Sequence, residues 1–327
     1  MSRVSHLKPS TALSQDKITR LRDRATQFKK VRAFFDQRNV LEVDCPILSS
    51  EASVDAHIDL ITAYYQGQHP YYLHSSPEYG MKRLLAEGIG DIYQLSHVFR
   101  DGEHSLKHNP EFMMAEWYRL NFTLEQLIEE TLHFMHLFLG PLPHRLVSYR
   151  ETFLTYTGLD YVHTSEEALF QYIKEHNISY YESIIEDGKD ALLNLILGSQ
   201  IEPLLGQREL YVLAYYPSTQ AALARQQQRG EETVAERYEV YYQGIELANG
   251  YHELTDASEQ AQRFKESNLQ RLALGKQILP PDQRFLKALE KGLPDCSGVA
   301  VGFDRLMMLR QQQQEIANVL TWGWQEI

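Results

Sequence analysis

The residues best suited to chemistry lie in a short polar segment between two strand-like stretches. Apolar, β-branched and aromatic residues favour one strand ending at Phe99 and another over residues 112–118. Residues 100–109 between them form a polar loop, with Gly102 inside it and Pro110 after it as breakers. Arg100, Lys107 and His108 lie on this loop. This arrangement is suited to holding a polyanion on a rigid platform.

The second strand carries Glu116 and Tyr118, which lie two residues apart and therefore on one face. That face is expected to meet whatever the loop holds. For an isolated loop of this length, a surface hairpin with a solvated charged tip is the better interpretation. Agreement with other segments of the chain weighs against it here.

Residues 234–256 are the second informative stretch. Residues 238–242 and 245–247 are strand-like, with Gln243-Gly244 as the turn between them. Three glutamates recur at intervals of seven: Glu239, Glu246 and Glu253. Chance spacing of surface glutamates is the simpler explanation. Paired acids on adjacent strands nevertheless suit Mg²⁺, which takes one or two carboxylates and completes its shell with water and phosphate oxygens.

Several elements are expected around these segments. The apolar pattern predicts a helix over about 17–38. Ser76 is expected to cap a short helix with Pro77 at its first position, and Thr123 opens a capping box for a helix to about 139. Residues 141–205 indicate helices and loops without a chemical motif. The remaining predictions are a strand at 209–216, helices at 256–275 and 281–291, and a strand at 298–302 that leads into a helix at 304.

Two charged residues sit at helix starts. Glu78 in a first turn complements the helix dipole, which explains it without any function. Arg305 in a first turn opposes the dipole, so a purely structural role for it is less natural.

Length and composition exclude some classes of protein. The 327 residues suffice for one large domain or two ordinary ones, and 43% hydrophobic with 23% charged residues is ordinary for a soluble globular protein. No apolar run approaches the roughly 20 residues of a membrane span, and no signal peptide is evident. A net charge of −12 argues against broad nucleic-acid affinity. Cys45 and Cys296 are expected to be reduced, buried cysteines of a cytoplasmic protein.

The segment FRDGEHSLKHNPEF followed by MMAEWY resembles motif 2 of class II aminoacyl-tRNA synthetases of the lysyl type. VLEVDCPIL (40–48) resembles motif 1, and GVAVGFDRLMML (298–309) resembles motif 3. The resemblance implies an α+β fold: the class II catalytic core, an antiparallel β-sheet flanked by helices, forming a homodimer through motif 1. We expect a flexible N-terminus (1–16) and one catalytic domain (17–327). The expected helix at about 17–38 leads into motif 1, and the roughly 20 residues before that helix cannot form a five-stranded barrel. We therefore expect no anticodon-binding domain and no tRNA partner.

The resemblance also implies site residues. Arg100, Glu246 and Arg305 are implied to be catalytic, and Glu239 with Glu246 to hold Mg²⁺ with ATP. The implied ATP site comprises Arg100, Asp101, Gly102, Lys107, His108, Asn109, Phe112, Glu246, Leu247, Gly302 and Arg305. The implied amino-acid site comprises Ser76, Pro77, Glu78, Glu116, Tyr118, Asn249, Glu253 and Ala300. A pocket with three carboxylates calls for a substrate with two amino groups.

Two positions depart from the lysyl pattern. The motif 2 sequence FRNE of the family reads FRDG here, so Gly102 replaces a nucleotide-contacting glutamate. The neighbouring Glu103 is the residue that could take over this contact. In the motif 3 strand, Ala300 stands where the lysyl synthetases have glycine. Its methyl group would reshape the pocket floor and could favour a displaced amino group, a change that discriminates by about 1–3 kcal/mol.

The stretches ELANGYHELTDA and PDCSGVAVG most closely resemble the elongation factor P–lysine ligases, which are paralogues of lysyl-tRNA synthetases. The resemblance implies activation of (R)-β-lysine by ATP and its transfer to a lysine side chain of elongation factor P. Three alternatives stay open: a truncated synthetase loading α-lysine onto tRNA, a non-catalytic amino-acid or nucleotide sensor, and a maker of free adenylate. The sensor predicts a damaged ATP site, yet Arg100, Glu239, Glu246 and Arg305 are all present.

Overall fold

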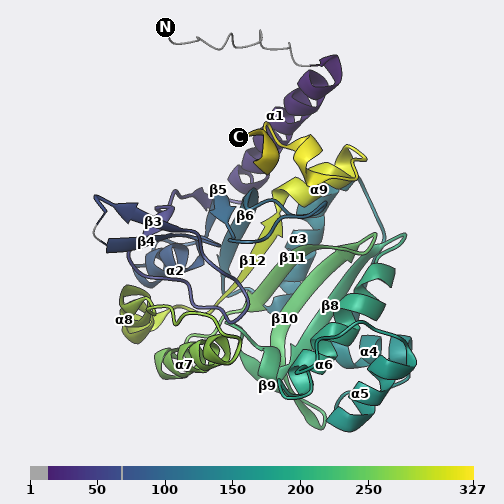
Figure 1. The fold of residues 1–327 in the computed structure, drawn as a ribbon. Helices are drawn as coiled ribbons and strands as arrows, with labels where there is room; N and C mark the ends of the chain where they lie inside the picture. Colours follow the sequence, from purple (N-terminus) through teal and green to yellow (C-terminus); the bar gives the residue numbers. More distant parts are fainter. Residues whose placement is uncertain (1–13, 68) are drawn as a thin grey trace, which may run out of the picture.

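One large sheet forms the centre of the molecule (Figure 1), a computed structural model that describes residues 14–67 and 69–327. Within these residues the sheet has nine strands in the order β1-β5-β6-β12-β11-β10-β8-β7, with β9 paired to β10. Their bounds are β1 Leu41–Glu42, β5 Ile92–Phe99, β6 Glu111–Leu120, β7 His144–Ser148, β8 Leu210–Pro217, β9 Gln226–Arg229, β10 Glu232–Tyr242, β11 Ile245–His252 and β12 Cys296–Gly302. A smaller sheet of β2 (Leu48–Ser49), β3 (Thr62–Tyr65) and β4 (His69–Leu73) lies beside it.

The predicted antiparallel sheet is confirmed in its middle and is mixed at its edges. All pairs from β5 to β8 along the sheet are antiparallel, whereas β1 pairs with β5 and β7 pairs with β8 in parallel. The predicted hairpins lie where expected, since β5 and β6 flank the loop at 100–110 and β10 and β11 flank Gln243-Gly244.

Helices cover the sheet and divide its apolar contacts into three clusters. α1 (Gln15–Asp36), α3 (Leu124–Leu139) and α9 (Phe303–Arg310) enclose the largest cluster, in which Phe35, Trp117 and Phe134 pack together. α4 (Tyr149–Thr157), α5 (Glu166–Glu175) and α6 (Lys189–Ile196) form a second cluster with β8. α2 (Glu78–Ala86), α7 (Ala257–Ala273) and α8 (Gln283–Gly292) form the third.

Short-range signals set several helix ends as predicted. Thr123 and Gln126 make the reciprocal capping box of α3, and the Asp256 side chain accepts from the backbone of Glu259 at the start of α7. The predicted helix at 17–38 is α1, which begins two residues earlier. The predicted flexible N-terminus lies, for residues 1–13, outside the described residues.

Two predictions about elements need correction. Pro77 is the cap of α2 and not its first residue, while the Ser76 hydroxyl accepts a 3.0 Å hydrogen bond from the Glu78 amide. The stretch 141–205 contains a strand, β7, and a π-helical turn at Leu197–Ile201 besides its helices.

Two further predictions concern the state of the cysteines and the absence of a membrane-spanning segment. Cys45 and Cys296 are both free, with Cys296 buried and Cys45 half-buried. Burial raises the pKa of the Cys45 thiol to about 11. Among the described residues, no helix is both long and apolar enough to cross a membrane.

Candidate active site

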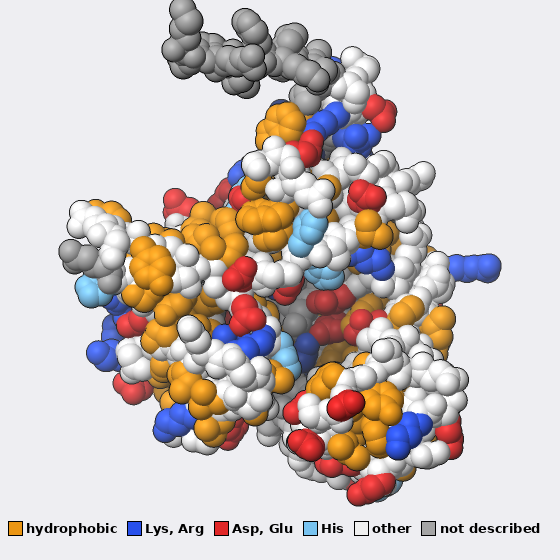
Figure 2. Space-filling view, in the orientation of Figure 1, with side chains coloured by type: hydrophobic (Ala, Val, Ile, Leu, Met, Phe, Trp, Pro, Cys, Tyr) orange, Lys and Arg blue, Asp and Glu red, His pale blue; other side chains and the backbone are white. Residues whose placement is uncertain are grey.

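A cavity of about 820 Å³ opens above the central strands, where β6, β10, β11 and β12 meet loops from both ends of the sheet. Figure 2 shows the hollow near the middle of this face, with acidic and basic side chains together inside it. Of the predicted site residues, all line this cavity except Pro77, Asp101 and Gly102. The structure therefore brings together side chains from five segments of the chain.

One end of the cavity is cationic. The Arg305 guanidinium lies 2.7 Å from Nε2 of His108 and donates to the backbone carbonyl of Glu246 at 2.8 Å. Burial and the nearby Arg305 charge lower the pKa of His108, so its ring is neutral and Nε2 serves as the acceptor. The Arg100 guanidinium lies 5.2 Å from the centre of the Phe112 ring, and its buried Nε–H has no hydrogen-bond partner. An unpartnered buried donor on a cation is suited to an anionic ligand.

Buried anchors hold these cations in place. Asp304, buried at the start of α9, accepts from the Met113 amide at 2.7 Å and pairs with Arg24 of α1. The next residue, Arg305, is thereby fixed against β6. Asn109 is also buried, and its side chain bonds the Glu111 carbonyl at 2.6 Å and the Trp324 amide at 3.0 Å.

The departure at Gly102 has a conformational explanation. Gly102 adopts a φ of +75°, a region that favours glycine, and it does not line the cavity. Glu103 lines the cavity instead, with its carboxylate 3.6 Å from Arg100.

Three carboxylates gather near Arg305. Glu239 accepts hydrogen bonds from Arg237, Tyr216 and Tyr241 at 2.5–2.6 Å, and Glu246 keeps 39% of its side chain exposed. Burial and the neighbouring Glu239 charge raise the pKa of Glu246. The same causes, with Glu246 as a further neighbour, raise the pKa of Glu202 to about 7.

This donor set fits Mg²⁺. Like charges side by side favour a divalent cation between them, and three donors on Glu239 leave part of its oxygen capacity free. In the described part of the chain no three candidate ligands are arranged so that they could hold a metal ion by themselves. Glu239 and Glu246 would therefore rely on water and phosphate for the remaining positions.

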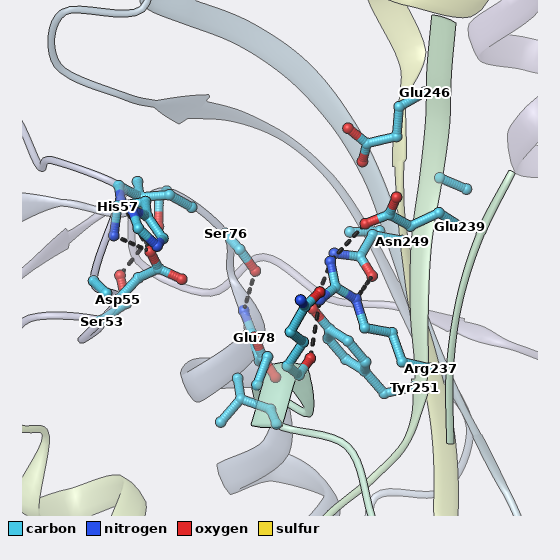
Figure 3. A pocket seen from close by; sticks show the side chains of 18 of the residues that line it. Ser53, Asp55, His57, Ser76, Glu78, Arg237, Glu239, Glu246, Asn249 and Tyr251 are labelled. Carbon is cyan, nitrogen blue, oxygen red and sulfur yellow. Dashed lines mark hydrogen bonds and ion pairs between the residues drawn. The ribbon is translucent and has the colours of Figure 1, made fainter. Parts of the chain in front are cut away.

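Arg237 links this acidic group to the middle of the cavity (Figure 3). Its guanidinium donates to Glu239 at 2.5 Å, to the side-chain oxygen of Asn249 at 3.3 Å and to the Gln220 carbonyl at 3.0 Å. The Asn249 amide in turn donates to the Tyr251 hydroxyl at 3.0 Å. The orientation of Asn249 is therefore set by a network of half-buried side chains.

The opposite end of the cavity is acidic and almost fully buried. Glu116 is 2% exposed and accepts from the hydroxyls of Ser76 and Tyr118, each at 2.7 Å. Burial and the neighbouring Glu78 charge raise the pKa of Glu116 to about 7. Glu253 is 1% exposed, and burial raises its pKa to about 8. These groups are suited to accepting ammonium hydrogens.

Strand register places the floor of the cavity between the acids and the network. Ala300 on β12 pairs with Glu116 on β6 and with Asn249 on β11. Ala300 therefore lies between Glu116 and Asn249 across the sheet, in the lining of the cavity.

Sequence reasoning missed several residues of the site. Lys82 pairs with two of the acids, and Glu202 and Arg237 lie beside Glu239. Residues 53–58 form the wall facing Glu78, held there by Arg271, which donates to two carbonyls of this loop. Only Lys82 had a usable signal, because it follows Glu78 by four residues on a predicted helix.

Comparison with known proteins gives a consistent result. The family model described as tRNA synthetases class II (D, K and N) matches residues 10–325. A protein of Haemophilus influenzae named elongation factor P–(R)-β-lysine ligase is 39% identical over 99% of both chains. Proteins of the same name from Avibacterium paragallinarum and Salmonella gallinarum are 41% and 40% identical over at least 94% of each chain. This chain thus belongs to the class II tRNA synthetase family and, within it, to the family of the elongation factor P–(R)-β-lysine ligases.

Proposed function

We propose that this protein activates (R)-β-lysine with ATP and transfers it to a lysine side chain of elongation factor P. The observation that carries the proposal is one cavity with opposite charges at its ends. Arg100 and Arg305 lie at one end, and Glu78, Glu116 and Glu253 at the other. A diamino acid bound between them would have its ammonium groups among the acids and its carboxylate toward the arginines.

Different residues of the cavity would contact different parts of ATP and the amino acid during activation. Arg100 would bridge the amino-acid carboxylate and the α-phosphate, which neutralises two anions that must approach each other. Arg305, His108 and Lys107 would contact the outer phosphates. Phe112 would stack on the adenine, and Asn249 would bind the carboxylate. The products of this step are the aminoacyl adenylate and pyrophosphate.

Glu239 and Glu246 would hold Mg²⁺, which when bound would neutralise phosphate charge. Arg237 keeps Glu239 directed at the cavity through its 2.5 Å contact. Transfer then requires only an acceptor amine, which attacks the adenylate carbonyl, forms an amide and releases AMP. No thiol or serine nucleophile is needed for it.

We also propose the wider setting of this activity. The enzyme would act in the cytoplasm on a translation factor, without a tRNA partner. It would form a homodimer through the motif 1 segment, where Leu41, Ile47 and Leu48 are 52%, 39% and 41% exposed.

Pyrophosphate exchange tests amino-acid activation directly. With ATP present, exchange should be faster with (R)-β-lysine than with α-lysine. Faster exchange with α-lysine, together with label on tRNA, would favour a synthetase. The absence of exchange with either amino acid would favour a sensor.

A further inference from the structure

Lys82 is a buried ammonium at the acidic end to which the proposed reaction assigns no role. It lies on α2 with its side chain 1% exposed, between Met81 and Leu85 of the apolar cluster. Its Nζ is 2.6 Å from a carboxylate oxygen of Glu78 and 2.5 Å from one of Glu253. Burying an ammonium costs several kcal/mol unless it is paired, so these two carboxylates hold it there.

The acidic end of the cavity has more negative than positive side chains. Glu78, Glu116 and Glu253 contribute three negative charges when ionised, and Lys82 compensates one of them. Burial raises the pKa of the Tyr118 hydroxyl and of the Cys296 thiol, so both of these neighbours are neutral. With all three carboxylates ionised, two negative charges remain uncompensated, which equals the number of ammonium groups on a diamino acid.

At the acidic end, the carboxylate of Glu253 is not saturated by hydrogen-bond donors of the protein. Although Glu253 touches Lys82 at 2.5 Å, neither of its oxygens accepts a hydrogen bond of good geometry. A buried carboxylate with free lone pairs is suited to an ammonium ligand. The ligand would share Glu253 and Glu78 with Lys82.

We propose that Lys82 is a positioning and specificity-determining residue, whose ammonium holds the carboxylates of Glu78 and Glu253 together so that the acidic end matches the two ammonium groups of a diamino acid. This inference rests on the proposed activation of such a substrate. Burial raises the pKa values of Glu116 and Glu253, and the Lys82 charge lowers both of them. Without that charge these carboxylates would keep a proton to higher pH. An incoming ammonium would then have to displace that proton, which weakens its binding near neutral pH.

The test is Lys82→Gln in the full chain, because glutamine removes the charge and keeps an N–H donor on a side chain only one atom shorter. Pyrophosphate exchange is measured against (R)-β-lysine concentration from pH 6 to 9. At pH 7 the KM for the amino acid should rise about tenfold or more, since one pKa unit of added proton affinity is a factor of ten. The KM for ATP should change less than about twofold, and the wild-type and variant KM values should converge at high pH.

Two further variants make the test specific. Arg83→Gln removes the same charge from an exposed neighbour on α2 and should leave the KM and the pH profile unchanged. Lys82→Gln combined with Glu253→Gln leaves two negative charges again. Its KM should be lower than that of either single variant, a non-additivity expected of coupled groups. The double variant also tests the proposal if Lys82→Gln alone does not fold.

Other results would overturn the proposal. Lys82→Gln with a lowered melting temperature, an unchanged KM and an unchanged pH profile would make Lys82 a structural residue only. Additive effects in the double variant would do the same. Failure of the wild-type protein to exchange with any diamino acid would instead overturn the proposed function.

Discussion

At the scale of residues, the separation of charge along one cavity decides what can bind. Arg100 and Arg305 attract carboxylate and phosphate, whereas Glu116 and Glu253 attract ammonium groups at the other end. A molecule with both kinds of group can bind in only one direction. This brings its carboxylate to the nucleotide end, where an approach to the α-phosphate is needed.

Arg100→Ala and Glu246→Ala should each reduce pyrophosphate exchange by at least about 10²-fold, because each removes charge stabilisation at the reacting phosphate. Arg145→Ala, which alters an arginine 56% exposed on β7, serves as the control. Equal melting temperatures would show that the variants fold. Exchange within tenfold of wild type in either site variant would remove that residue from the proposed machinery.

Binding of the diamino acid should also depend on pH. The pKa values of Glu116 and Glu253 are raised to about 7 and about 8, and only the ionised forms attract an ammonium strongly. The kcat/KM for (R)-β-lysine should therefore increase as pH rises from 6 to about 8.5. Glu116→Gln should remove the component near pH 7. A flat wild-type profile over this range would contradict the assignment of these carboxylates.

At the scale of elements, close contact between β12 and β6 shapes the acidic end. A Cβ at Gly298 would lie 2.2 Å from the Tyr118 ring and 2.6 Å from a Glu253 oxygen. Gly298→Ala should therefore destabilise the fold by about 1–3 kcal/mol and raise the KM for the diamino acid. Gly198→Ala, at a position with no atom within 4 Å of the new Cβ, is the matched control for thermal unfolding. Equal stability of the two variants would show that Tyr118 and Glu253 move aside without lowering the free energy of unfolding.

The elements that the sequence predicts are those with short-range signals. Thr123 and Asp256 cap helices through side chains within three residues, and the β10–β11 turn lies at Gln243-Gly244. β7 was missed because three of its five residues are exposed and it pairs in parallel with β8, which follows more than sixty residues later. The π-helical turn before Glu202 has no pattern that distinguishes it from an α-helix.

The same distinction holds for the site. Arg100, Glu116 and Glu246 lie in contiguous motifs and could be predicted, and the structure places all three in one cavity. Arg237 contacts Asn249 only in the folded chain, and the spacing of Lys82 from Glu78 gives no sign of its second partner, Glu253. A lysine beside apolar helix residues and an arginine in a strand are otherwise ordinary surface residues by sequence.

At the scale of the whole molecule, the helical cluster of residues 149–205 serves as one wall of the site. Asp190, Asn194 and Glu202 from this region line the cavity, opposite residues 53–58. The segment without a chemical motif is thus part of the active-site boundary.

The proposed dimer gives a prediction at this scale. Leu41→Asp combined with Leu48→Asp places charges on the exposed motif 1 segment and should convert a dimer to a monomer in sedimentation experiments. Leu146→Asp, which alters a leucine 41% exposed on β7, should leave the oligomeric state unchanged. A wild-type protein that sediments as a monomer would contradict the proposed dimer.

The central claim is transfer of (R)-β-lysine to a protein amine, and intact-mass analysis of elongation factor P tests it most directly. The factor is incubated with the enzyme, ATP, Mg²⁺ and (R)-β-lysine. We expect a mass increase of one β-lysyl group on a single lysine, which is lost with Arg100→Ala. An unchanged mass of the factor, measured while pyrophosphate exchange proceeds, would contradict the claim and point to a different acceptor.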